Sequence, residues 1–140
     1  RSGLSPPHPV PPQQPGVTPI HRRSGWRTPR VDPVCPLIGN LCAHDDWQAQ
    51  DAALNDAYAK AVLMLEEWDA NLPQAERGAV QALKEGQRAW ITFRDKACEA
   101  EGYAMRGGSA EGLLVYGCMA RLTEDRAGQL SWMIEAYGSF

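Results

Sequence analysis

Apolar side chains recur at steps of three and four residues from residue 45 onward, which is the spacing of one face of an α-helix. The pattern predicts three long helices, from about 45 to 71, from about 74 onward, and from about 110 to 137. The breaks between them are NLP at 71–73 and RGGS at 106–109. No stretch shows the alternation that is typical of a strand. Three long helices joined by tight turns predict an all-α, up-down-up three-helix bundle.

Short polar residues or proline stand where each helix is expected to begin. Asp45 or Asp46 is placed to cap the first helix and Ser109 the third, because their side-chain oxygens can accept hydrogen bonds from the free N–H groups of a first turn. Pro73 is placed at or just before the first turn of the second helix, where a missing N–H is tolerated.

The first part of the chain has a different composition. Residues 1–36 contain ten of the eleven prolines, and proline lacks the N–H and fixes φ, so neither a helix nor a central strand is expected there. We place the proline-rich arm at residues 1–34, with residues 1–30 expected to be disordered, and the helical domain at residues 35–140. Residues 31–44 are expected to form an ordered N-terminal coil that is anchored by disulfide bonding of Cys35 and Cys42.

Each predicted helix carries a charged residue in the middle of its apolar face. On a helical wheel, Asp51 falls there in the first helix, Arg94 in the second and Arg126 in the third. Gln87 lies beside Arg94 on the same face. An unpaired charge in a core would cost several kcal/mol, so we expect each of these groups to have a partner.

The hairpin of the first two helices supplies partners. Asp51 and Arg94 lie at nearly equal separations before and after Pro73, so in an antiparallel pair they come to the same height. We predict an ion pair between them, since the planar fork of arginine suits a fixed carboxylate. Tyr58 and Gln87 match in the same way, with Asn55 close by.

The second turn completes the network. It brings Arg126 to the height of Trp90, whereas Asp95 lies at the edge of the face, where it either pairs with neighbours of Arg94 or stays in water. We interpret the set as a buried polar layer that fixes helix register, the alternative being a binding or catalytic centre in a cleft. The predicted network consists of Asp51, Asn55, Tyr58, Gln87, Trp90, Arg94, Asp95 and Arg126.

The sequence gives little support for enzyme chemistry. No Ser–His or Cys–His constellation, no carboxylate pair suited to hydrolysis and no glycine-rich nucleotide loop accompanies the network. An enzyme with Asp51, Arg94 and Asp95 at its catalytic site is therefore the disfavoured alternative. We expect a non-enzymatic protein that uses no cofactor.

Charge is divided unequally along the chain. Residues 41–140 carry nine Lys or Arg and sixteen Asp or Glu, a net charge of −7, whereas residues 1–40 carry a net charge of +4. An acidic body disfavours nucleic acid as a partner, because phosphate binding needs clustered cations. It favours a basic protein partner by raising the association rate, although a moderate charge also serves solubility alone. No apolar run is long enough to span a bilayer.

The four cysteines form no CxxC pair, and the three histidines include no pair at metal-ligand spacing, so we expect no metal site. An even number of cysteines in a small chain favours two disulfides and an oxidising compartment, against four reduced thiols as the alternative. The cysteines are Cys35, Cys42, Cys98 and Cys118.

Three segments taken together are more specific than any one of them. DAALNDAY at 51–58, GQRAWITFRDKAC at 86–98 and GGSAEGLLVYGCMARLTEDRAGQL at 107–130 resemble the LprI-like lysozyme-inhibitor family, over about residues 40–135. The short coil before Cys42 and the proline-rich arm depart from that pattern. The positions that match it are Asp51, Leu54, Asn55, Tyr58, Gln87, Trp90, Arg94, Asp95, Cys98, Gly108, Ser109, Cys118, Leu122, Thr123, Arg126 and Leu130.

The resemblance implies a small bacterial helical domain that is periplasmic, secreted or lipid-anchored and has oxidised cysteines. No lipobox surrounds Cys42, so lipid anchoring does not carry over, and no signal peptide is visible in the chain. Two disulfide pairings remain open: Cys98–Cys118 with Cys35–Cys42, or Cys42–Cys98 with Cys35–Cys118.

Some members of that family bind and inhibit lysozyme. The resemblance therefore implies an extracytoplasmic protein that occludes a basic peptidoglycan-cleaving enzyme, and the alternative is an envelope interaction or immunity-like module with a partner other than lysozyme. Charge clustering at the cysteine-rich end of the bundle suggests the partner-binding surface. Its candidate residues are Asp45, Asp46, Glu99, Glu101 and Glu111.

Overall fold

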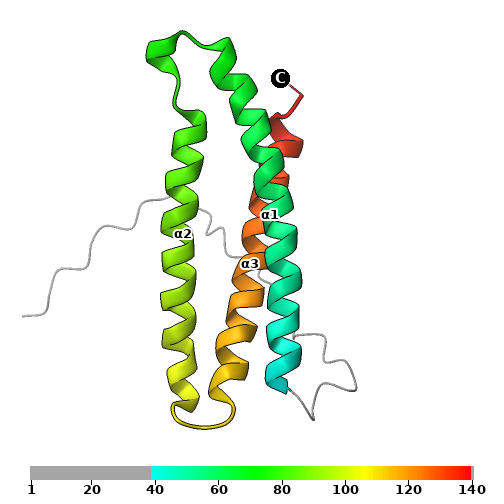
Figure 1. Cartoon of the computed structure of the whole chain (residues 1–140), viewed down its shortest axis with the longest axis vertical. Coiled ribbons are helices and arrows are strands. Elements are labelled where there is room, and N and C mark those ends of the chain that lie inside the picture. Colours follow the sequence, from blue (N-terminus) through cyan, green and yellow to red (C-terminus); the bar gives the residue numbers. More distant parts are fainter. Residues whose placement is uncertain (1–38, 140) are drawn as a thin grey trace, which may run out of the picture. The chain divides into compact units, whose positions relative to one another are not determined.

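Three long helices run up, down and up again in the computed structural model, which describes residues 39–139 (Figure 1). The predicted all-α three-helix bundle is confirmed. The proline-rich arm, Cys35 and most of the expected N-terminal coil lie outside the described residues. The helices are α1 (Gly39–Asn71), α2 (Ala79–Gly102) and α3 (Glu111–Tyr137), with short 3₁₀ turns η2 (Gln74–Glu76) and η3 (Tyr103–Met105) between them.

The first helix begins earlier than predicted. α1 starts at Gly39, so residues 39–44 are helical rather than coil, and neither Asp45 nor Asp46 caps the helix. No proline stands between Gly39 and Asp45, so nothing in this stretch stops the helix from extending toward the N-terminus. A tertiary contact also holds the extra turn, because the Asn40 side-chain amide donates to the carbonyl of Ser109 at 3.2 Å.

The start of α2 is fixed by a side chain of α1. Pro73 precedes the single 3₁₀ turn η2, and the α-helix itself begins only at Ala79. The Asp69 carboxylate accepts hydrogen bonds from the backbone N–H groups of Gly78 and Ala79, both at 2.9 Å, and of Val80 at 3.1 Å. Asp69 therefore does what an N-cap side chain does, but from the end of the preceding helix.

The start of α3 differs from the prediction by one residue. Ala110 is the N-cap and makes no side-chain cap hydrogen bond, so Ser109 is not the cap. The turn is instead held by Glu111, whose carboxylate accepts from the backbone N–H of Gly107 at 2.8 Å and from Arg106 at 2.7 Å. Gly107 has a φ of 76°, a left-handed conformation that glycine adopts without steric cost.

The core lies mainly between α1 and α3, which make the most extensive helix–helix contact and run side by side in Figure 1. Small residues on α1, Ala57 and Ala61, are almost fully buried and let the helices approach closely. None of the helices in the described part is long and apolar enough to cross a membrane. The buried cluster consists of Leu54, Ala57, Ala61, Met64, Leu65, Leu83 and Leu130.

Candidate functional site

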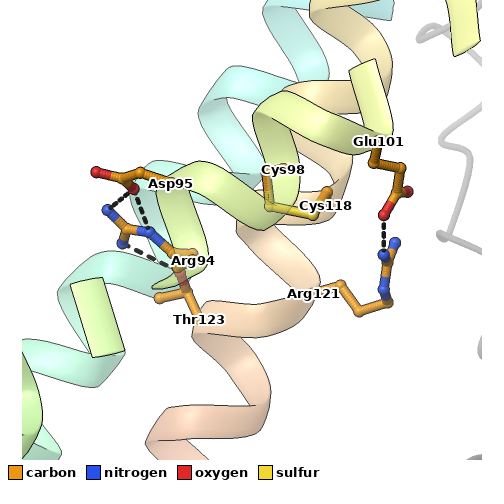
Figure 2. The surroundings of a disulfide bond; sticks show 7 residues. All are labelled: Arg94, Asp95, Cys98, Glu101, Cys118, Arg121 and Thr123. Atoms are coloured by element: carbon orange, nitrogen blue, oxygen red, sulfur yellow. Dashed lines mark hydrogen bonds and ion pairs between the residues drawn. A yellow bond between two sulfur atoms is a disulfide. The ribbon is translucent and has the colours of Figure 1, made fainter. Parts of the chain in front are cut away.

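Arg94 on α2 is the centre of the polar layer. The residue is only 7% exposed, although its side chain is charged. Its Nε and Nη2 atoms lie 2.9 and 2.8 Å from Asp95 Oδ1, and its Nη1 lies 3.6 Å from Asp51 Oδ1 on α1. The same Nη1 donates to Thr123 Oγ1 on α3 at 3.4 Å, as Figure 2 shows. One guanidinium therefore contacts all three helices.

Two indole rings complete the surroundings of this guanidinium. The Arg94 Cζ atom lies 5.2 Å from the ring centroid of Trp90 and 5.8 Å from that of Trp47. Both distances fall within the range of cation–π attraction. Carboxylates and aromatic faces together compensate for the water that Arg94 loses on burial.

Two partners of Arg94, Asp95 and Thr123, were not predicted from the sequence. Asp95 was expected to pair with neighbours of Arg94 or to stay in water, but it accepts from Arg94 itself. Figure 2 shows the Asp95 carboxylate beside the Arg94 guanidinium. Thr123 was missed, although it is completely buried and its hydroxyl is one of the partners of Arg94. A hydroxyl on the inward face of α3, at the expected height of Arg94, was the available signal.

Arg126 joins the layer through Gln87. Its Nε donates to Gln87 Oε1 at 3.0 Å, and its Nη1 donates to Gln129 Oε1 at 3.0 Å. Partial burial lowers the pKa of Arg126 below its ordinary value, but a guanidinium stays protonated at neutral pH. Gln87 also lies near Asn55 and Tyr58, as expected from their nearly equal separations from Pro73. Asn55 donates to Asp51 at 3.4 Å.

The layer is less enclosed than the sequence pattern suggested. Arg94 is buried, but the side chains of Asp51 and Asp95 are 41% and 50% exposed, and Asn55 lies in solvent. Carboxylates can remain hydrated at the rim while the cation sits beneath them, which lowers the desolvation cost of the ion pairs. A buried guanidinium with its donors engaged is suited to holding helices together rather than to touching a ligand.

The buried indole N–H of Trp47 has no hydrogen-bond partner in the described part of the chain. Trp47 packs against Tyr116 with ring centroids 5.8 Å apart, and His44 lies edge-on to both rings. Trp47 follows the apolar spacing of the first helix, but that spacing does not show the ring contacts with His44 and Tyr116.

The disulfide pairing is decided for two of the four cysteines. Cys98 and Cys118 are bonded to each other across the α2–α3 hairpin (Figure 2). The alternative in which Cys98 pairs with Cys42 is therefore wrong. Cys42 is itself disulfide-bonded, and Cys35 lies outside the described residues.

The five candidate partner-binding carboxylates fall into two groups. Glu99, Glu101 and Glu111 make ion pairs within the chain, with Lys96 at 2.6 Å, Arg121 at 2.8 Å and Arg106 at 2.7 Å. The hydrogen bond from Lys96 lowers the pKa of Glu99, and the backbone N–H of Gly107, together with Arg106, lowers that of Glu111. Asp45 and Asp46 are exposed, and neither forms an ion pair with Lys or Arg in the described part.

The groups that this arrangement leaves accessible to another molecule are mainly surface carboxylates. Within residues 39–139, no group of three or more His, Cys, Asp or Glu is placed to hold a metal ion. The carboxylates that remain available to a partner are surface groups on a domain whose acidic residues outnumber its basic ones. Such a surface attracts cationic groups of another molecule.

Comparison with known proteins gives a family match over most of this region. Residues 38–130 match the family described as "Lysozyme inhibitor LprI". An uncharacterized protein of Rhizobium meliloti (strain 1021) is 44% identical over 100 residues, which cover 69% of this chain and 72% of that protein. The uncharacterized protein YecT of Escherichia coli (strain K12) is 36% identical over 75 residues, which cover 53% of this chain and 46% of YecT.

A solved structure shares the fold. The crystal structure of a DUF1311 family protein from Pseudomonas putida KT2440 superposes with a TM-score of 0.57 at 22% sequence identity. The match covers 66% of this chain and 86% of the other. At this identity the likeness concerns the helical architecture alone.

Proposed function

The chain belongs to the family of the lysozyme inhibitor LprI, and from this premise we propose that it is an extracytoplasmic binding protein that occludes a basic peptidoglycan-cleaving enzyme. The observation that carries the proposal, beside the family, is the charge of the helical body. Residues 41–140 have a net charge of −7, and the exposed carboxylates are distributed over all three helices. Such a field attracts a cationic enzyme and accelerates its encounter with the domain.

The proposed role is binding, without catalysis and without a cofactor. The group that most resembles a catalytic residue, Arg94, is buried and contacts Asp95, Asp51 and Thr123. A structural role is enough to explain these contacts, because they join α2 to both other helices. This supports assigning the polar layer to the architecture and the inhibitory contacts to the surface.

The contact surface that we propose is the disulfide end of the bundle. In Figure 1 the start of α1 lies at the same end as the α2–α3 turn, which brings Asp45 and Asp46 to the end that carries Glu101 and Glu111. Within the chain, Glu101 and Glu111 are already neutralised by Arg121 and Arg106. Asp45 and Asp46 therefore remain the strongest candidates to meet a cationic group of the enzyme.

The experiment is an assay of cell-wall lysis by several types of lysozyme, with the protein added at micromolar concentration and low salt. Wild-type protein is expected to slow lysis, and the effect should weaken as salt screens the charges. An absence of inhibition of every lysozyme at low salt would contradict the proposal. Recovery of a single envelope protein other than a lysozyme as a saturable partner would then favour the alternative, an interaction or immunity-like module.

A matched pair of variants tests the proposed surface. Asp45→Asn/Asp46→Asn should weaken inhibition, whereas Glu66→Gln/Glu67→Gln should leave it nearly unchanged. Both pairs are adjacent exposed carboxylates on α1, and both substitutions remove two negative charges. Equal loss of inhibition in the two variants would show that net charge matters and that the disulfide end does not.

A further inference from the structure

A shallow hollow lies between α1 and α2 at the level of the polar layer. Its volume is about 350 Å³, which is enough for a small molecule. α1 supplies two of its lining residues and α2 supplies the other four. The lining residues are Asn55, Tyr58, Lys84, Gln87, Arg88 and Ile91.

Cations that have no carboxylate partner among residues 39–139 gather around this hollow. Of the nine Lys and Arg side chains in the described part, five form ion pairs with Asp or Glu: Lys60, Arg94, Lys96, Arg106 and Arg121. Lys84 and Arg88 line the hollow without such a pair, and Arg126 contacts its wall through Gln87. The fourth cation without such a pair in the described part, Arg77, lies just before the start of α2 and close to Asp69.

The hydrogen bond from Arg126 fixes the orientation of the Gln87 amide, and so which of its atoms can bind a ligand. A guanidinium is a donor only, so the Gln87 oxygen must face Arg126, and its NH₂ group remains available as a donor. Asn55 uses one of the two N–H groups of its own amide on Asp51. The donors that the hollow offers therefore include the charged ends of Lys84 and Arg88, the Gln87 amide and the Tyr58 hydroxyl.

Lys84 and Arg88 stand one turn apart on α2, at positions i and i+4. Like charges at this spacing repel each other and destabilise the helix, and an anion between them would remove that repulsion. Ile91, which is 41% exposed, and the ring of Tyr58 add an apolar wall. No carboxylate of residues 39–139 lines the hollow: Glu85, which stands between Lys84 and Arg88 in the sequence of α2, accepts from Gln81 at 2.7 Å, and Asp51 is held by Arg94 and Asn55.

We propose that this hollow binds a small oxyanion, a carboxylate or phosphate that carries a short apolar group. The oxyanion would lie between Lys84 and Arg88 and accept from Gln87, with its apolar group against Ile91 and Tyr58. The excess of negative charge on the domain opposes anions in general, so a ligand gains affinity here only through these local contacts. This site is independent of the proposed enzyme inhibition.

The test is an NMR titration of the full chain at constant ionic strength with three probes. Inorganic phosphate and N-acetyl-alanyl-alanine present the two kinds of oxyanion, and the C-terminal amide of the same peptide is the neutral counterpart. We expect saturable shifts of the backbone and side-chain signals of Gln87, Arg88 and Ile91 with at least one oxyanion probe, and much weaker shifts with the amide. Saturation with the peptide alone would identify a carboxylate with an apolar group as the ligand, and saturation with phosphate alone would identify a phosphate.

Variants with the same change in charge provide the control. Lys84→Gln/Arg88→Gln should weaken binding by at least about tenfold, because two charge-assisted contacts are lost. Lys60→Gln/Arg77→Gln removes the same two positive charges away from the hollow and should bind like wild type. Gln87→Glu, which is nearly isosteric and can pair with Arg126, should abolish binding in a folded protein.

Three outcomes would overturn the proposal. One is the absence of saturable binding by either oxyanion probe. The second is equal weakening in the two double variants, which would indicate a nonspecific charge effect. The third is equal binding of the peptide acid and its amide, since the oxyanion would then contribute nothing.

Discussion

A single buried guanidinium accounts for much of what specifies this bundle. Arg94 meets carboxylates from α1 and α2, a hydroxyl from α3 and two indole faces. Apolar contacts tolerate small shifts between helices, but hydrogen bonds to a planar fork do not. The layer is therefore expected to select one helix register among several that would bury similar apolar area.

Arg94→Ala should destabilise the fold by about 3–5 kcal/mol, the usual cost of breaking a buried ion pair from one side. Arg94→Lys should recover little of this loss, since one ammonium cannot reach Asp95, Asp51 and Thr123 together. Chemical denaturation measures both variants. Lys60→Ala is the control, because it removes only an exposed pair with Asp56 and should cost below about 1 kcal/mol. A similarly small loss for Arg94→Ala would show that the layer is not what holds the register.

The carboxylate of Asp69 predicts how the stability of the fold depends on pH. Three backbone N–H groups, those of Gly78, Ala79 and Val80, hold the pKa of Asp69 below its ordinary value of 3.8. A group whose pKa is lower in the folded state stabilises the protein above its unfolded-state pKa and loses that contribution as pH falls through the folded-state pKa. Wild-type protein should therefore be more stable than Asp69→Asn near neutral pH, and the difference should shrink as pH falls below 3.8.

Thermal unfolding of both proteins from neutral pH to acid measures this difference. Asp56→Asn, which changes an exposed carboxylate elsewhere on α1, is the control. Its difference in stability from wild type should not shrink in the same way as pH falls. A difference between wild type and Asp69→Asn that stays constant with pH would mean that the charge of the cap is unimportant.

At the scale of helices, the sequence predicts the three elements, the ends of α1 and α3 and the start of α3 to within one residue, but not the starts of α1 and α2. The interior of each helix follows from its own apolar stripe, so the three-helix bundle and the Asp51–Arg94 proximity could be deduced from spacing. The two missed starts depend on other elements. Asp69 of α1 caps α2, so no local pattern around residue 79 could show where α2 begins, and Asn40 in the extra turn of α1 donates to Ser109 in the turn before α3.

The α2–α3 contact near the turn gives a prediction at the same scale. Gly102 is buried, and a Cβ placed there would lie 2.6 Å from Val115 Cγ2 on α3. Gly102→Ala should therefore destabilise the protein by about 1–3 kcal/mol through overpacking. Adding Val115→Ala should recover part of that loss, because it removes the clashing methyl group. Denaturation of the two single variants and the double variant measures the coupling, and simple additivity would contradict a direct clash.

At the scale of the whole molecule, the uneven charge sets the expected behaviour toward partners. The helical body is acidic, and many carboxylates of residues 39–139 form no ion pair with a Lys or Arg of that range. The field of such a body extends over about 8–10 Å at physiological salt, which is far enough to guide an encounter before contact. Electrostatic attraction of this kind acts mainly on the association rate.

The association rate with a basic lysozyme should therefore fall as sodium chloride is raised, while the dissociation rate changes less. Surface plasmon resonance over a salt series separates the two rates. A dissociation rate that carries most of the salt dependence would place the charged groups inside the contact rather than around it.

The Cys98–Cys118 bond also determines how the protein would respond to proteolysis. The exposed turn between α2 and α3 contains Arg106, a residue that trypsin can cleave, and both cysteines lie outside that turn on the two helices. A chain cut at this point would consist of two polypeptides that remain covalently joined. On a gel it should migrate as one species without reductant and as two fragments with it, and the nicked protein should keep its helices in place. The turn is therefore a position where a peptide tag or a second domain could be inserted without separating α2 from α3.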